Sequence, residues 1–199
     1  MMAKLPNRMQ YAGLGVLAAV FFLSPGTESR SQARTAAPPD IYANFVGVWV
    51  GTDHYLKDGA EVTKPLRLTI EETKKKDAMR FMYEYGTKGQ KDYSQPRRRI
   101  TLNPSRAEMT SEWDDSAKDH WKALGLDLFA QKNLGLFRAV AADEENGKKV
   151  VWVETFDLGK DTFRYVVERS EDGRTFAITK TFVLNREAQP PGSSALQTH

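Results

Sequence analysis

Apolar and polar residues alternate along most of the chain with a period of two. The rows formed by every second residue are, in chain order, Phe45, Gly47, Trp49, Gly51 and Asp53; Leu66, Leu68 and Ile70; Met79, Phe81, Tyr83 and Tyr85; Arg98, Ile100 and Leu102; Met109, Ser111 and Trp113; Val150, Trp152, Glu154 and Phe156; Phe163, Tyr165 and Val167; and Phe176, Ile178, Lys180, Phe182 and Leu184. Such alternation is typical of strands that have one buried and one exposed face.

Short turn sequences separate these runs, among them Lys57-Asp58-Gly59, Glu145-Asn146-Gly147 and Glu171-Asp172-Gly173. Asn-Gly and Asp-Gly suit the positive backbone angles of tight hairpins, so consecutive strands are predicted to be antiparallel neighbours. At usual strand and turn lengths, about eight to ten strands fit the region. The pattern favours an all-β, antiparallel up-and-down barrel, because closing the sheet removes both exposed edges. Residues 116–133 break the alternation and predict a short helix or a flap.

The first 26 residues have the pattern of a secretory signal peptide. Lys4 and Arg8 form a basic start, Tyr11–Leu23 is uncharged and apolar, and Ser24-Pro25-Gly26 ends the run. This run is shorter than the roughly 20 residues that a membrane span needs. We therefore predict a periplasmic or secreted protein with no stable membrane insertion after removal of the signal. The alternative is an uncleaved N-terminal anchor, which also places the domain outside the cytoplasm.

The predicted signal peptide, residues 1–26, is followed by three further regions. Residues 27–40 are rich in Ser, Thr, Ala and Pro and predict a flexible linker. Residues 41–187 form the predicted barrel domain, and residues 188–199 are predicted to be a disordered C-terminal tail.

Composition removes several classes of function. The chain has no cysteine, which excludes disulfides, thiol catalysis and Cys-ligated metals. The net charge of +3 falls to +1 when Lys4 and Arg8 leave with the signal peptide, so the charge gives no support for nucleic-acid binding. Hydrophobic residues make up 40% of the 199 residues, enough for a packed core.

The segment Phe45-Val46-Gly47-Val48-Trp49-Val50-Gly51 opens the first predicted strand. It resembles the Gly-x-Trp signature of lipocalin-like (calycin) barrels, in particular small bacterial lipocalin-like domains of unassigned function and, more distantly, the nitrobindin haem-binding barrels. The resemblance implies a lipocalin-like barrel from about Phe45 to Glu187. It also implies that Arg186, at the end of the last strand, packs over the ring of Trp49 and closes one end of the barrel. Gly47, Trp49 and Arg186 are thus expected to be structural.

The haem-binding branch of this group needs an axial histidine on a late strand. The histidines of this chain are His54, His120 and His199, and none lies on the last four predicted strands. We therefore expect neither haem nor another cofactor. No two histidines have metal-ligand spacing either, so we expect no metal site.

Charged residues within the apolar rows are the candidate ligand-binding groups. Glu154 and Lys180 interrupt rows on late strands, where an unpaired buried charge is costly. Three interpretations stay open for them: an internal ion pair that anchors a ligand, an internal ion pair that is only structural, or strand ends at which the row leaves the core. Arg98 is a third candidate, although Arg97-Arg98-Arg99 is also typical of a solvated face. The predicted aromatic wall around them consists of Tyr83, Tyr85, Trp113, Trp152 and Tyr165. A small apolar molecule is the ligand that aromatic walls with a few polar groups suit.

Two other interpretations stay open. A barrel-fold enzyme of the isomerase, cyclase or hydrolase type would use a buried Glu154 as acid or base. A barrel filled by its own side chains would act through its surface as an interaction module. Asp53 and His54 do not form a catalytic Asp–His dyad in either case, because adjacent strand residues point to opposite faces.

Overall fold

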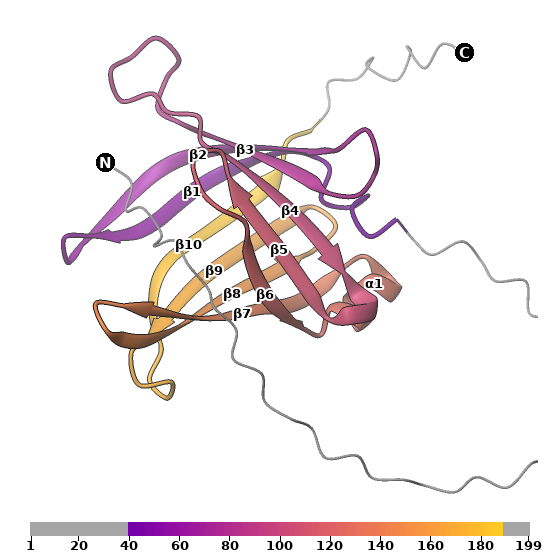
Figure 1. Cartoon of the computed structure of the whole chain (residues 1–199). Coiled ribbons are helices and arrows are strands. Elements are labelled where there is room, and N and C mark those ends of the chain that lie inside the picture. The colour runs from indigo at the N-terminus through magenta and orange to yellow at the C-terminus, as the bar shows by residue number, and fades with distance from the viewer. Residues whose placement is uncertain (1–39, 189–199) are drawn as a thin grey trace, which may run out of the picture.

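Ten antiparallel strands close into a barrel in residues 40–188, the part of the chain that the computed structural model describes (Figure 1). Each strand pairs with its neighbours in sequence, and β1 pairs with β10 to close the sheet. The strands are β1 (Gly47–Lys57), β2 (Ala60–Glu72), β3 (Met79–Tyr85), β4 (Arg97–Asn103), β5 (Glu108–Trp113), β6 (Asp119–Leu124), β7 (Gly135–Glu145), β8 (Lys148–Leu158), β9 (Thr162–Ser170) and β10 (Ala177–Arg186). The all-β up-and-down barrel predicted from the alternation is confirmed.

The apolar rows face the barrel interior. Trp49, Leu68, Phe81 and Ile100 are at most 1% exposed, and Phe163 is fully buried. The Phe163 ring lies 5.4 to 6.5 Å from five other rings, measured between centroids. Side chains of the barrel itself therefore pack this part of the interior, as they do in small barrels.

The alternating direction of the strands gives the barrel two different ends. The turns β1–β2, β3–β4, β5–β6, β7–β8 and β9–β10 lie at one end, which we call the hairpin end. The opposite end carries α1 (Leu126–Lys132), and we call it the α1 end (Figure 1). The short helix η1 (Pro104–Arg106) links β4 to β5 at the α1 end.

The α1 end is closed by apolar side chains. Leu126 and Phe129 are the buried residues of α1, and the Phe129 ring lies 5.5 Å from the ring of Phe45, just before β1. Asn133, directly after α1, donates from its side chain to the Asp40 carbonyl at 2.7 Å. This helix falls within residues 116–133, where the sequence predicts a helix or flap, although the first half of that segment forms β6 and the end of the preceding turn.

Arg186 and Trp49 close the α1 end beside the helix. They are cross-strand partners in β10 and β1, and the guanidinium lies 4.2 Å from the centre of the Trp49 ring. Arg186 also donates to the backbone carbonyls of Asn44, Val46 and Lys160. The predicted contact between Trp49 and Arg186 is present, and Gly47 provides space for it, because a Cβ there would lie 2.7 Å from an Arg186 nitrogen.

The start of β10 departs from the predicted alternation. Phe176 precedes the strand and is 38% exposed, and Ile178 is 54% exposed. A register shift between Ile178 and Lys180 is the reason, since a bulge of one residue moves the side chains before it to another face. The inward row of β10 therefore begins at Lys180.

Predictions for the chain ends lie outside the described residues. They are the signal peptide at 1–26, most of the linker at 27–40 and all but the first residue of the tail at 188–199, together with Lys4, Arg8 and His199. Among residues 40–188, no helix has the length and apolar character needed to cross a membrane.

Candidate functional site

The centre of the candidate site is an ion pair between opposite walls of the barrel. Arg98 on β4 and Glu154 on β8 are separated by β5, β6 and β7 on one side and by the other five strands on the other. One guanidinium nitrogen of Arg98 donates to both carboxylate oxygens of Glu154, at 2.9 and 2.7 Å. Both residues are at least 96% buried, so the pair crosses the interior itself, and the solvated face suggested by Arg97-Arg98-Arg99 is wrong for Arg98.

The other two guanidinium nitrogens of Arg98 also donate hydrogen bonds. Its Nε donates to the Ser111 hydroxyl at 2.6 Å and its other terminal nitrogen to the Tyr165 hydroxyl at 3.1 Å. The guanidinium lies 5.3 Å from the centre of the Trp113 ring. Burial alone would lower the pKa of Arg98, but the negative charge of Glu154 raises it above its usual value. Arg98 is therefore a permanent cation held in place by three strands other than its own.

A second ion pair lies on the neighbouring part of the wall. Lys180 on β10 lies 2.9 Å from an Asp53 carboxylate oxygen on β1, and that same oxygen accepts from the Tyr85 hydroxyl at 2.7 Å. Lys180 also donates to Tyr85 Oη at 3.1 Å. Burial, followed by the charge of Asp53, raises the pKa of Tyr85, which keeps this hydroxyl a donor. Asp53 is 1% exposed, whereas the Lys180 side chain is 25% exposed toward the hairpin end.

One oxygen of the Asp53 carboxylate is unpaired. Its Oδ1 is buried and has no hydrogen-bond partner within residues 40–188. Buried polar atoms nearly always have partners, and a carboxylate oxygen accepts more than one hydrogen bond. The site thus contains an acceptor that nothing in the described chain satisfies.

Aromatic rings connect the two ion pairs. The rings of Tyr83 and Trp113 stack with centroids 5.5 Å apart, and Lys180 lies 6.0 Å from the centre of the Tyr83 ring. Tyr165 stacks on Phe182 at 4.7 Å. Burial raises the pKa of both Tyr83 and Tyr165, so these hydroxyls stay neutral at ordinary pH. Trp113 is only partly buried, which leaves one aromatic surface available at the hairpin end.

The rim of the hairpin end carries a third charged group. Arg169 on β9 pairs with Glu145 at 2.8 Å and with Glu171 at 2.7 Å. Its guanidinium lies 5.7 Å from the centre of the Trp152 ring, and Trp152 Nε1 donates to Glu145 at 3.2 Å. Trp152 is partly buried and shares the inward row of Glu154.

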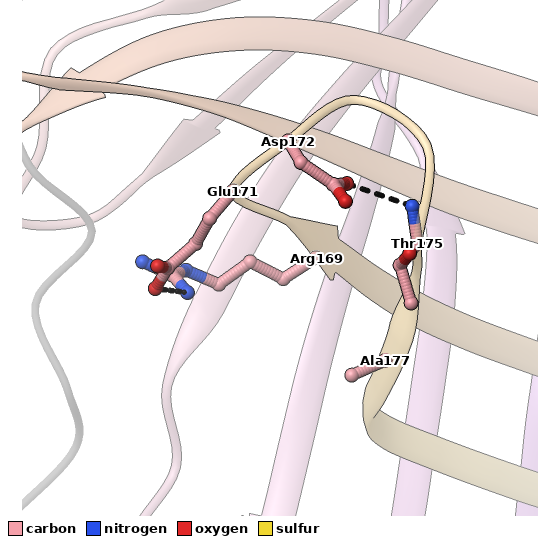
Figure 2. A pocket seen from close by; sticks show the side chains of 5 residues that line it. All are labelled: Arg169, Glu171, Asp172, Thr175 and Ala177. Carbon is pink, nitrogen blue, oxygen red and sulfur yellow. Dashed lines mark hydrogen bonds and ion pairs between the residues drawn. The ribbon is translucent and has the colours of Figure 1, made fainter.

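An open depression of about 340 Å³ adjoins this rim. It lies in the β9–β10 turn and is lined by Arg169, Glu171, Asp172, Thr175 and Ala177 (Figure 2). Asp172 accepts from the backbone N–H groups of Arg174 and Thr175, and these bonds lower its pKa to about 2. Its carboxylate is thereby committed to shaping the turn.

The structure brings all eight predicted ligand-binding residues to the hairpin half of the interior, but it pairs the charges differently. Glu154 binds Arg98 across the interior and Lys180 binds Asp53 on the adjacent strand β1, so the predicted partners do not bind each other. Sequence reasoning missed Asp53 and Ser111 as members of the site. Both positions stood in inward rows, so the alternation itself was the signal that would have identified them.

The chemistry open to these groups is narrow. Both oxygens of Glu154 accept from a guanidinium, so this carboxylate is not free to take a proton from a substrate. His54 points outward, where its ring nitrogens contact the Thr52 and Thr63 hydroxyls, while Asp53 points inward. In the described part of the chain, no group of three or more His, Asp or Glu side chains is placed to hold a metal ion. The arrangement provides hydrogen bonding and stacking, and it commits Glu154 to Arg98.

Comparison with known proteins adds no further information, because no protein-family model and no curated protein matches the sequence.

Proposed function

We propose that this protein is an exported lipocalin-like barrel that binds a small hydrophobic ligand in the hairpin half of its interior. The observation that carries the proposal is the difference between the two ends. The phenylalanine rings at the α1 end, such as that of Phe45, are buried, whereas the aromatic rings of Trp113 and Trp152 at the hairpin end are only partly buried. Aromatic surface next to a few fixed polar groups is typical of small-molecule sites.

The lipocalin-like part of the proposal is supported by the Trp49–Arg186 contact. The Gly-x-Trp segment, the position of the arginine at the end of the last strand and the distance of 4.2 Å all agree with the calycin pattern. Fold alone does not determine function, so the ligand-binding proposal depends on the site residues. Both carboxylate oxygens of Glu154 accept from Arg98, which supports ligand binding over an enzyme that would use Glu154 as acid or base.

Titration with the neutral fluorescent probe N-phenyl-1-naphthylamine tests ligand binding. We expect saturable fluorescence enhancement with a stoichiometry of one probe per chain. Ala141 and Ala142 provide a matched pair of variants, because Ala141 faces inward opposite Trp152 and Ala142 is exposed on the outer surface. Ala141→Trp should weaken binding at least tenfold by filling the interior, and Ala142→Trp should leave it unchanged. Equal binding by both folded variants would refute an interior site.

Export is proposed on the basic and apolar pattern of residues 1–26. The test is the N-terminal sequence of the protein recovered from the extracytoplasmic fraction of expressing cells. We expect it to start after Gly26 or after Ala33, the two positions preceded by a small residue at −3. An intact N-terminus in the cytoplasmic fraction would contradict export.

A further inference from the structure

The two interior ion pairs leave the candidate site without excess charge, and we infer from this that its ligand is electrically neutral and donates a hydrogen bond to Asp53 Oδ1. This inference rests on the proposed function and specifies the chemical class of ligand. Three observations carry it: the neutralised cations, the unpaired carboxylate oxygen and the stacked rings beside it.

Arg98 and Lys180, the cations of the two interior ion pairs, already have counter-ions. Arg98 is bound to Glu154, and Lys180 is bound to Asp53. An anionic ligand would have to displace Asp53 from Lys180 and leave a carboxylate buried without its partner, which is strongly unfavourable. A cationic ligand would meet the ammonium of Lys180 on its way to the same carboxylate.

The inward-facing charges nearer the rim add no net positive charge to the site. Near the hairpin end, the half-buried charged residues of the inward rows are the cations Lys64 and Arg169 and the acids Asp119, Asp143 and Glu145. Burial raises the pKa of Asp119, and the charges of Glu154 and Asp143 also act in that direction. These groups therefore provide no positive excess that would attract a carboxylate or phosphate.

The unpaired oxygen supplies the polar contact. Asp53 Oδ2 accepts from Tyr85 and Lys180, whereas Oδ1 is buried and has no partner in the described chain. An N–H or O–H group of a ligand would satisfy it and would replace a water molecule, the competing donor.

The rings beside this group favour a flat apolar body. Tyr83 and Trp113 are stacked with 28° between their planes, and Lys180 lies within 6.0 Å of the ring centres of both Tyr83 and Tyr85. A planar aromatic molecule gains contact area and offset stacking from such a wall.

Three probes that share a naphthalene ring separate charge from hydrogen bonding: 2-naphthamide is neutral with a donor, methyl 2-naphthoate is neutral without a donor, and 2-naphthoate is an anion. Dissociation constants are measured by equilibrium dialysis at pH 7 with the full chain. We expect 2-naphthamide to bind at least tenfold more tightly than either of the others. Equal affinities, or tighter binding of 2-naphthoate, would overturn the inference and leave interior binding in place. Failure of all three probes to bind would overturn both.

Asp53→Asn provides the decisive variant, because it frees Lys180 from its counter-ion while keeping the shape of the side chain. We expect it to bind 2-naphthoate at least tenfold more tightly than the wild type does, and to lose the preference for 2-naphthamide. Glu112→Gln removes an acid from the exposed outer face of β5 and should keep the wild-type order. An unchanged order in Asp53→Asn would overturn the inference.

Lys180→Met keeps the test valid if Asp53→Asn does not fold, since Lys180 is only partly buried. This variant leaves the Asp53 carboxylate without its cation. We expect it to bind the cation 2-naphthylmethylamine at least tenfold more tightly than the wild type does. No gain in that affinity would contradict the assignment of Lys180 as the group that neutralises Asp53.

Discussion

Arg98 connects more of the barrel wall than its position in a run of three arginines suggests. Its guanidinium contacts Ser111 and Trp113 on β5, Glu154 on β8 and Tyr165 on β9. A planar group with five N–H donors suits this role, because it can address several acceptors at fixed angles. As a consequence, Ser111, Tyr165 and Glu154 would each lose a buried hydrogen bond, and Glu154 its counter-ion, if Arg98 were removed.

Removing Arg98 alone should therefore be far more damaging than removing the whole pair. We expect Arg98→Met to lower the free energy of unfolding by about 3–5 kcal/mol, because Glu154 is then left buried and uncompensated. The double variant Arg98→Met/Glu154→Gln should recover most of this loss in urea unfolding. Arg99→Met is the control, since Arg99 is 50% exposed and its ion pair with Asp77 is worth about 1 kcal/mol or less. A double variant no more stable than Arg98→Met would contradict the explanation.

The pairing of these charges could not be predicted from the sequence. The alternation indicates which residues face inward, and for Glu154, Lys180, Trp113 and Tyr165 this information was correct. It does not indicate which strands face one another across a closed barrel. That relation depends on the number of strands and on the stagger between them. Only the structure therefore identifies Arg98 as the partner of Glu154 and Asp53 as the partner of Lys180.

At the scale of elements, eight of the ten strands were predictable from their period of two, and six of the nine connections between strands contain a glycine. The strands β6 and β7 were not among the predicted rows. The bulge in β10 was not predictable, since Ile178 and Lys180 occupy the same row in the sequence and the shift between them comes from pairing with β9. Barrel closure was likewise inferred only from the need to cover sheet edges. The structure shows that closure depends on a close approach of two backbones at Gly51.

A side chain at position 51 should open the contact between β1 and β10. A Cβ there would overlap the Val183 carbonyl oxygen and lie 3.1 Å from Leu184 Cα, and backbone atoms cannot move aside as a flexible side chain can. We expect Gly51→Ala to lower the free energy of unfolding by about 1–3 kcal/mol. Thr52→Ala, at the exposed neighbouring position, should change it by about 0.5 kcal/mol or less. Urea unfolding followed by circular dichroism measures both, and similar values would contradict the role of Gly51.

For the whole molecule, we propose that the two ends of the barrel have different roles, with packing that stabilises the fold at the α1 end and ligand binding at the hairpin end. Phe45 at the α1 end is fully buried and lies 5.5 to 6.4 Å from the rings of Phe129, Phe163 and Phe81. Trp113 at the hairpin end is partly buried and lies against Tyr83 and Arg98. Both are aromatic residues of inward rows, and the sequence alone assigns them the same environment. Their different exposure makes them a matched pair for testing whether the ends have different roles.

We expect opposite effects from truncating these two residues. Phe45→Ala leaves a cavity among packed rings and should cost about 3–5 kcal/mol of unfolding free energy, yet the folded fraction should bind N-phenyl-1-naphthylamine with wild-type affinity. Trp113→Leu removes a surface that is already partly exposed, so it should cost about 1 kcal/mol while weakening the probe at least tenfold. Unfolding curves and probe titrations on the same preparations give both quantities. A loss of affinity in folded Phe45→Ala equal to that in Trp113→Leu would show that the ligand extends through the barrel, since only an occupied α1 end links the packing around Phe45 to binding.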